Sequence, residues 1–141
     1  MKMSWFLLAI SALVLFAGLV LVQKHLLNLG INPIVWGFYL MGLTFIGFLI
    51  TSIMTKQKLT IPSAWWIFLI LAAVITLLAN IASTYSFQSA PNPAYTQAII
   101  SASGILVLFI SIFLFKSEIT LIKSIGVILI TIGVILLGIN K

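Results

Sequence analysis

Charged residues divide the chain into four long uncharged stretches, and each of these is mostly apolar. They cover residues 3–23, 26–55, 59–115 and 124–140. A helix that crosses the bilayer needs about 20 mostly apolar residues. The first, second and fourth stretches therefore predict one membrane helix each. Lys123 lengthens the fourth, because a lysine side chain can extend along apolar surface and place its ammonium group at the interface.

The third stretch is too long for a single crossing, and two prolines interrupt it. Pro91 and Pro93 flank Asn92, and prolines fix φ and remove backbone donors, so a tight turn between two helices is predicted there. Pro33 and Pro62 stand where helices are expected to begin, a position that suits a residue without an N–H group. The chain is thus predicted to be an all-α, polytopic membrane helix bundle with five transmembrane helices. The spans are about 4–27, 33–55, 63–89, 94–115 and 121–139, within a single domain of residues 1–141.

Composition agrees with a protein built for lipid. Apolar residues make up 63% of the chain and charged residues only 6%, too few polar side chains to cover a core of this size in water. The net charge of +6 comes from lysines alone. Because they are scattered singly, they form no basic patch, and nucleic-acid binding is excluded. The first stretch is longer than the apolar part of a signal peptide, so it is expected to be a retained span.

The lysines also predict an orientation in the cell membrane. With the N-terminus in the cytoplasm, five lysines face the cytoplasm and two, Lys24 and Lys141, face outside. The positive-inside rule therefore favours a cytoplasmic N-terminus and an external C-terminus. Insertion in both directions remains open, because Lys24 opposes the bias.

Polar side chains gather at one end of the predicted bundle, on helices one, three and four. Since a polar group in hydrocarbon is costly unless it is paired or faces a cavity, this gathering predicts a polar cavity that opens to the outside. The alternative is that the same groups hydrogen-bond between helices and hold them together. The substrate-binding candidates are Lys24, Asn80, Thr84, Tyr85, Tyr95, Gln97 and Ser101.

Lys24 and His25 each allow two interpretations. Either side chain could contact an anionic substrate, and His25 could also carry protons. Both could instead mark the interfacial end of the first helix, with their polar ends in water. The second interpretation is favoured for both residues.

Small residues recur every seven positions on several predicted helices. On the last helix they are Gly126 and Gly133, which would let another backbone approach closely in lipid. The contact could lie within the chain or between two molecules.

The residues needed for catalysis are nearly all missing. With one glutamate, one histidine, no aspartate and no cysteine, the chain cannot supply a carboxylate pair, a metal cluster or a nucleophilic triad. Glu118 is expected to be a solvated charge in the fourth loop. The chain is therefore predicted not to be an enzyme and to carry no cofactor or metal.

The order and spacing of several short motifs resemble a known family. The fourth loop holds Glu118 and Thr120, and the last helix follows with Gly126 and Gly133 seven residues apart; Pro91-Asn92-Pro93 and Lys24 also fit. This pattern resembles the closing signature of the drug/metabolite transporter superfamily, in its EamA-type branch. The resemblance covers nearly the whole chain as one five-helix repeat.

The resemblance implies one half of an inverted-repeat transporter fold. Members of this family commonly have two such repeats of opposite orientation around a central substrate site, whereas this sequence has one. Alternating access needs both halves, so the chain would pair with an antiparallel copy of itself or with a partner of opposite topology. No acidic residue lies in a predicted span, so the glutamate-based proton exchange of the small multidrug transporters cannot be carried over.

The leading hypothesis is a transporter of a small metabolite or drug-like solute that works in the lipid bilayer by alternating access in a dimer. In it, Asn80, Thr84, Gln97 and Ser101 hydrogen-bond the substrate, and Lys24 attracts a negative group. Tyr85 and Tyr95 act as gates in the same hypothesis. Two alternatives are an accessory or assembly membrane subunit and a lipid-headgroup flippase.

Overall fold

The computed structural model describes residues 5–115 and 120–139, and this part of the chain is helical without any strand. It forms an all-α membrane protein, as predicted. The chain divides into two compact units, Met1–Ser89 and Ala90–Lys141, here called the N-terminal and C-terminal units. Outside the described residues lie Lys2, Ser4, Lys116, Glu118 and Lys141, as does the side chain of Lys123.

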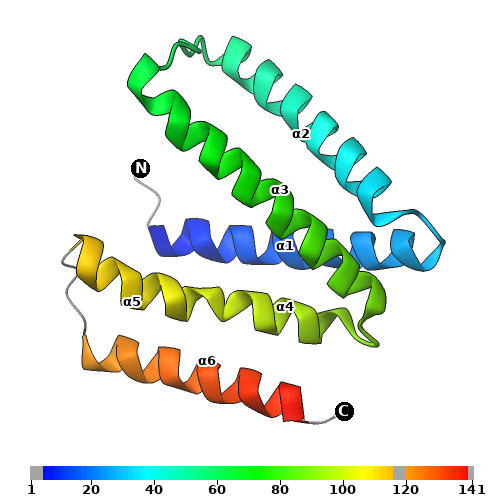
Figure 1. Ribbon diagram of the computed structural model, residues 1–141, viewed down its shortest axis with the longest axis vertical. Coiled ribbons are helices and arrows are strands. Elements are labelled where there is room, and N and C mark those ends of the chain that lie inside the picture. Colours follow the sequence, from blue (N-terminus) through cyan, green and yellow to red (C-terminus); the bar gives the residue numbers. More distant parts are fainter. Residues whose placement is uncertain (1–4, 116–119, 140–141) are drawn as a thin grey trace. The chain divides into compact units, whose positions relative to one another are not determined.

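The N-terminal unit contains three long helices and one short one. These are α1 (Trp5–Asn28), α2 (Pro33–Met54), the 3₁₀ helix η1 (Ser63–Trp65) and α3 (Trp66–Ser89). The helix α3 contacts both α1 and α2, and α2 and α3 form an antiparallel hairpin (Figure 1). This unit therefore has α3 as its central element.

The helices α1 and α2 end in the same way. After α1, the Gly30 N–H group donates to the Leu27 carbonyl at 3.0 Å and the Ile31 N–H to the Leu26 carbonyl at 3.3 Å. This is a Schellman arrangement, which needs a residue with positive φ, and Gly30 has a φ of 93°. After α2, the equivalent residue is Lys56, with a φ of 52°.

The C-terminal unit contains α4 (Pro93–Ser101), α5 (Ser103–Phe115) and α6 (Leu121–Ile139). Within this unit α6 contacts α4 and α5 and runs back alongside them (Figure 1). Asn92 caps α4, because its side-chain oxygen accepts a 2.9 Å hydrogen bond from the Ala94 N–H group, and Pro93 fills the first helical position. Asn32 and Pro33 begin α2 with the same arrangement.

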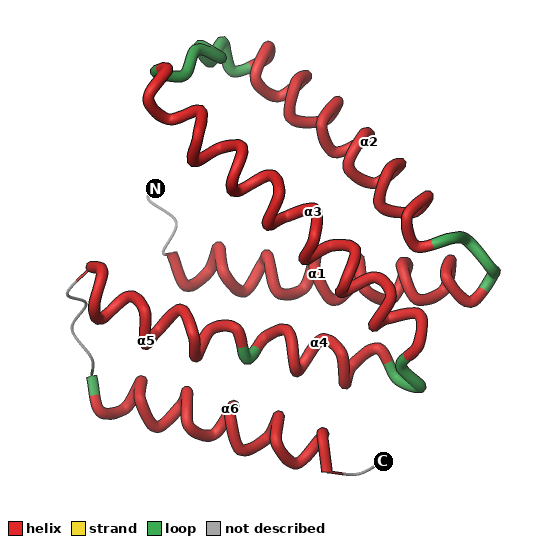
Figure 2. Tube along the Cα trace, viewed as in Figure 1, coloured by secondary structure: helices red, strands yellow, loops and turns green. Residues whose placement is uncertain are grey.

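A break at Ala102 divides the segment that the sequence predicts as one helix. The Ser101 hydroxyl donates to the Gln97 carbonyl at 2.8 Å, a back-bond that bends helices. The Ala102 N–H group is shared between the Ala98 and Ile99 carbonyls. The Ile105 N–H group then donates to the Ala102 carbonyl three residues earlier at 2.9 Å. The result is a single tight turn between α4 and α5 (Figure 2).

Four helical segments of the described chain are long and apolar enough to cross a membrane. They are Trp5–Asn28, Pro33–Met54, Ser63–Ser89 and Pro93–Leu114. A shorter apolar helix covers Ser124–Leu136. These four segments begin and end within one residue of the predicted spans, although η1 opens the third and the break at Ala102 divides the fourth. The predicted total of five crossings stays a prediction.

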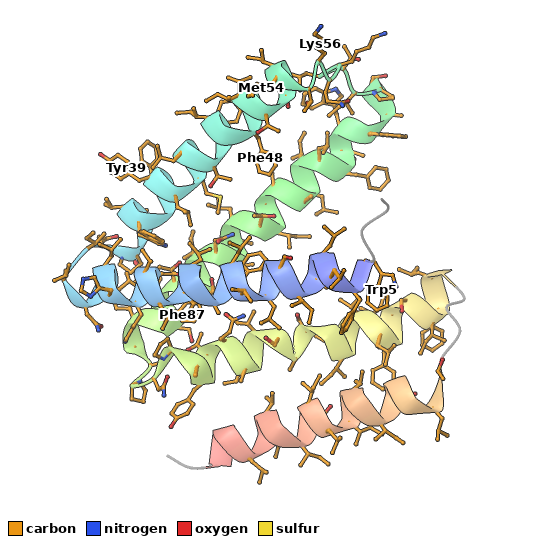
Figure 3. The ribbon with its side chains drawn as sticks, turned by 180° about the vertical axis from the view of Figure 1, so that it is seen from behind. Trp5, Tyr39, Phe48, Met54, Lys56 and Phe87 are labelled. Carbon is orange, nitrogen blue, oxygen red and sulfur yellow. The ribbon has the colours of Figure 1, made fainter. Side chains whose placement is uncertain are left out.

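Apolar side chains on these helices face outward. Phe38 and Phe48 of α2 are 74% and 71% exposed, and the same holds for most large apolar residues of the long helices. A helix that is apolar all round is typical of a membrane span, where lipid covers the outer side chains. Figure 3 shows side chains projecting from all sides of α2, including Tyr39, Phe48 and Met54.

Candidate functional site

A hydrogen bond between two buried side chains joins α1 to α3. The Gln23 amide nitrogen (Nε2) donates to the Thr84 hydroxyl oxygen at 3.1 Å, and these residues are only 6% and 4% exposed. The Thr84 hydroxyl in turn donates to the Asn80 backbone carbonyl at 2.7 Å. Thr84 was predicted to bind substrate. Here its hydroxyl takes part in a short chain of hydrogen bonds between the two helices.

Lys24 contacts the C-terminal end of α3. Its ammonium nitrogen (Nζ) donates to the Phe87 carbonyl at 2.9 Å and to the Gln88 carbonyl at 3.2 Å. The last four carbonyls of a helix have no partner within the helix, and they carry the negative end of its dipole. Lys24 therefore caps α3, while its side chain remains partly exposed. Figure 3 shows Phe87 in this region, beside α1.

At helical spacing, Asn80, Ser83, Thr84 and Phe87 share one face of α3, and this is the least exposed face of the helix. Thr84 and Phe87 are buried, and Asn80 and Ser83 are partly buried. The Asn80 amide nitrogen (Nδ2) donates to the Thr76 carbonyl at 2.9 Å, and its side-chain oxygen accepts no hydrogen bond within the described residues. Asn80 thus keeps one acceptor available for a solute.

Tyr85 lies on the more exposed side of α3. Its side chain is 42% exposed, and its hydroxyl has no hydrogen-bond partner in the part of the chain that the structure describes. Tyr85 is the next residue after Thr84, and successive residues of a helix point about 100° apart. Its ring therefore lies beside the buried face and not within it. Its hydroxyl is free to contact a solute.

On α4, three predicted residues lie within two turns. Tyr95 is 45% exposed and Gln97 is partly exposed, and neither side chain has a hydrogen-bond partner among the described residues. The Ser101 hydroxyl is exposed and donates to the Gln97 carbonyl, which leaves its lone pairs able to accept. A further polar residue of this helix, Thr96, is buried.

Gly126 and Gly133 lie on a face of α6 that is open within the C-terminal unit. A Cβ atom added at either position would have no atom within 4 Å. The partly buried residues of α6 are on another face: Ser124, Val127, Thr131 and Val134. A close contact at the two glycines therefore needs an element from outside this unit, and the predicted intermolecular contact stays a prediction.

Gln23 is the residue that sequence reasoning left out of the candidate set. The sequence places it at the polar end of the first helix, but its partner Thr84 is 61 residues away, and pairing over that separation is not readable from the sequence. A signal did exist. Gln23 is the first polar side chain after Ser11 in α1, and an amide in such a helix needs a partner.

The described residues that could bind a metal ion or carry a proton are few and scattered. Among the described residues, no three His, Cys, Asp or Glu side chains lie close enough to hold a metal ion. His25 is exposed in the last turn of α1. The polar groups of the site are therefore amides, hydroxyls, backbone carbonyls and one ammonium group.

Comparison with known proteins identifies the family. Neither the curated proteins nor the solved structures gave a match. The model of the EamA-like transporter family, part of the drug/metabolite transporter superfamily, matches residues 3–139, which is nearly the whole chain. The resemblance inferred from the sequence is thus confirmed, and the chain belongs to the EamA-like transporter family.

Proposed function

We propose that this chain carries a small polar metabolite or drug-like solute across the cell membrane by alternating access. The observation that carries the proposal is the family match over residues 3–139, because members of this family are membrane transporters. The apolar helices and the polar residues on α3 and α4 supply the two features that such a function needs. Those features are a lipid-facing exterior and groups able to bind a solute.

The available groups favour a neutral or anionic solute bound by hydrogen bonds. The Asn80 side-chain oxygen, the Gln97 amide and the Tyr85 and Tyr95 hydroxyls are without partners among the described residues. The only acidic residue of the chain is Glu118, outside the predicted spans, so a buried carboxylate cannot neutralise a cationic solute. Lys24 adds a positive charge at the polar end of α1, although it already contacts α3.

A second molecule of opposite orientation supplies the other half of the transport pathway. Transporters with inverted repeats place their substrate site between two halves of opposite orientation. This chain has the helices of one half, so an antiparallel homodimer or a partner of opposite topology completes the pathway. In this proposal the N-terminus is cytoplasmic and the C-terminus external in the orientation that the lysines favour.

Two other functions use the same helices differently. In an assembly subunit the polar face joins helices and stays dry, and the Gln23–Thr84 hydrogen bond is a contact of that kind. In a lipid-headgroup flippase the solute is the polar part of a lipid. Movement of labelled phospholipid without movement of soluble metabolites would identify the flippase.

Flux through liposomes tests the transporter directly. The purified chain is reconstituted in liposomes loaded with radiolabelled neutral and anionic metabolites, and their release is compared with that from protein-free liposomes. We expect protein-dependent release of at least one solute. Asn80→Leu should reduce it about 10-fold, since it removes one hydrogen bond to the solute, whereas Ile75→Leu on an exposed part of α3 should leave it unchanged. Release equal to that of protein-free liposomes contradicts the proposal.

A further inference from the structure

An apolar hollow lies at the beginning of α3, at the opposite end of this helix from the polar residues. It has a volume of about 440 Å³ and is lined by Ile61, Trp65, Phe68 and Leu69. Trp65 and Phe68 are 61% and 67% exposed. The hollow is open and offers no hydrogen-bonding group, so only an apolar ligand fits it.

Two lysines precede this hollow in the loop that joins α2 to α3. Lys56 and Lys58 are exposed, and neither has an ion-pair or hydrogen-bond partner through its side chain within the described residues. No acidic residue occurs before Glu118, so nothing near them in the sequence offsets the two charges. Figure 3 shows Lys56 at the end of the hairpin, where its side chain projects away from the helices.

The distance between the charges and the hollow suits one lipid molecule. Lys58 is three residues before Ile61 and Lys56 is five residues before it. Because an extended chain spans at most about 3.6 Å per residue, their Cα atoms lie within about 11 Å and about 18 Å of that of Ile61. The headgroup region of a bilayer leaflet is about 5–8 Å thick outside the hydrocarbon core. A lipid whose acyl chain occupies the hollow therefore brings its phosphate into the range of the lysine side chains.

Two tryptophans indicate that the hollow lies near the headgroup level of the bilayer. Trp65 and the adjacent Trp66 are exposed at the start of α3, and exposed tryptophans favour the boundary between hydrocarbon and headgroups. We propose that the end of the α2–α3 hairpin binds one anionic phospholipid. Its acyl chain lies against Ile61, Trp65, Phe68 and Leu69, and its phosphate contacts Lys56 and Lys58. A zwitterionic lipid binds less well, because its headgroup has no net charge and gains little from the two lysines.

This lipid site is separate from the proposed transport pathway. Its residues lie between Lys56 and Leu69, whereas the transport candidates of the same unit, Asn80 and Tyr85, lie in the other half of α3. Loss of lipid binding and loss of transport are therefore distinguishable.

Lipid retention by the intact, purified chain tests the proposal. Native mass spectrometry in detergent compares phosphatidylglycerol with phosphatidylcholine of the same acyl composition. We expect preferential retention of phosphatidylglycerol. The variant Lys56→Gln/Lys58→Gln should lower this retention about 25-fold, since each lysine near an anionic lipid surface contributes about fivefold, and phosphatidylcholine retention should not change.

A matched control removes the same charge elsewhere. Lys116→Gln/Lys123→Gln lowers the net charge equally and should leave phosphatidylglycerol retention as it is. An equal loss in both double variants shows a general charge effect and overturns the site.

The acyl-chain contact has its own control. Phe68→Ala should lower phosphatidylglycerol retention several-fold, whereas Ile70→Ala, at a residue of similar exposure that does not line the hollow, should not. If Phe68→Ala has no effect and soluble glycerol phosphate competes with the lipid, the lysines bind free phosphate and the phospholipid site is wrong.

Discussion

Gln23 and Thr84 are 61 residues apart in the sequence and joined by a 3.1 Å hydrogen bond between α1 and α3. Both side chains are buried, so neither can exchange its partner for water without a cost. The bond links the first helix to the central helix of the N-terminal unit, at the end where the polar residues gather.

The pair should show measurable coupling in a double-mutant cycle. Thr84→Val leaves the Gln23 amide buried without its partner and should cost about 1–3 kcal/mol of unfolding free energy. Gln23→Leu/Thr84→Val should cost less than the sum of the single variants, with a coupling energy of about 0.5–1.5 kcal/mol. Equilibrium unfolding in mixed detergent micelles measures all four proteins. Strict additivity would mean that the bond does not form.

Lys24 should stabilise the end of α3 through its charge and its hydrogen bonds. Lys24→Met removes the ammonium group from the Phe87 and Gln88 carbonyls and should cost about 1 kcal/mol. Lys24→Arg should keep most of the stability, because a guanidinium group also donates to carbonyls. Hydrogen exchange of the last turn of α3 should become faster in Lys24→Met only. Unchanged exchange there would argue that the cap has no effect.

The position of Gly30 needs a glycine because of its backbone conformation and not because neighbouring atoms leave too little space for a side chain. Its φ is 93°, and an added Cβ atom would have no atom within 4 Å, as is also true of Gly18 inside α1. Gly30→Ala should therefore cost about 1 kcal/mol, whereas Gly18→Ala should be neutral or stabilise by up to about 1 kcal/mol. Unfolding midpoints of the two variants measure the difference. Equal effects would contradict the Schellman ending of α1.

The helices were predictable from the sequence because their signals are local. Lysines, prolines and apolar runs delimit them, and Pro33 begins α2 as expected. The break at Ala102 was not predictable. It coincides with the back-bond between Ser101 and the Gln97 carbonyl. Ser11, Thr44 and Thr84 form the same kind of bond inside helices that stay unbroken, so the serine alone does not predict a break.

The polar face of α3 was predictable for the same reason, but the partners of its residues were not. Helical spacing groups Asn80 with Thr84, and burial agrees with this grouping. No periodicity shows that Thr84 meets Gln23 or that Lys24 reaches the Gln88 carbonyl, since both contacts depend on how two helices pack. The roles of the candidate residues in binding stay predictions.

Water access to Asn80 and Gln97 is the central claim of the transport proposal, and single cysteines measure it most directly. The chain contains no cysteine, so Asn80→Cys and Gln97→Cys each supply one thiol to a charged methanethiosulfonate reagent, which reacts with the thiolate in water. Lys56→Cys in the exposed loop is the positive control, and Phe48→Cys, at an exposed apolar residue of α2, is the lipid-facing control. If the chain is a transporter, we expect the reagent to label the cysteines at positions 80, 97 and 56 in permeabilised membranes, but not the cysteine at position 48. Reaction at residue 56 alone, with 80 and 97 as unreactive as 48, would contradict the proposed pathway.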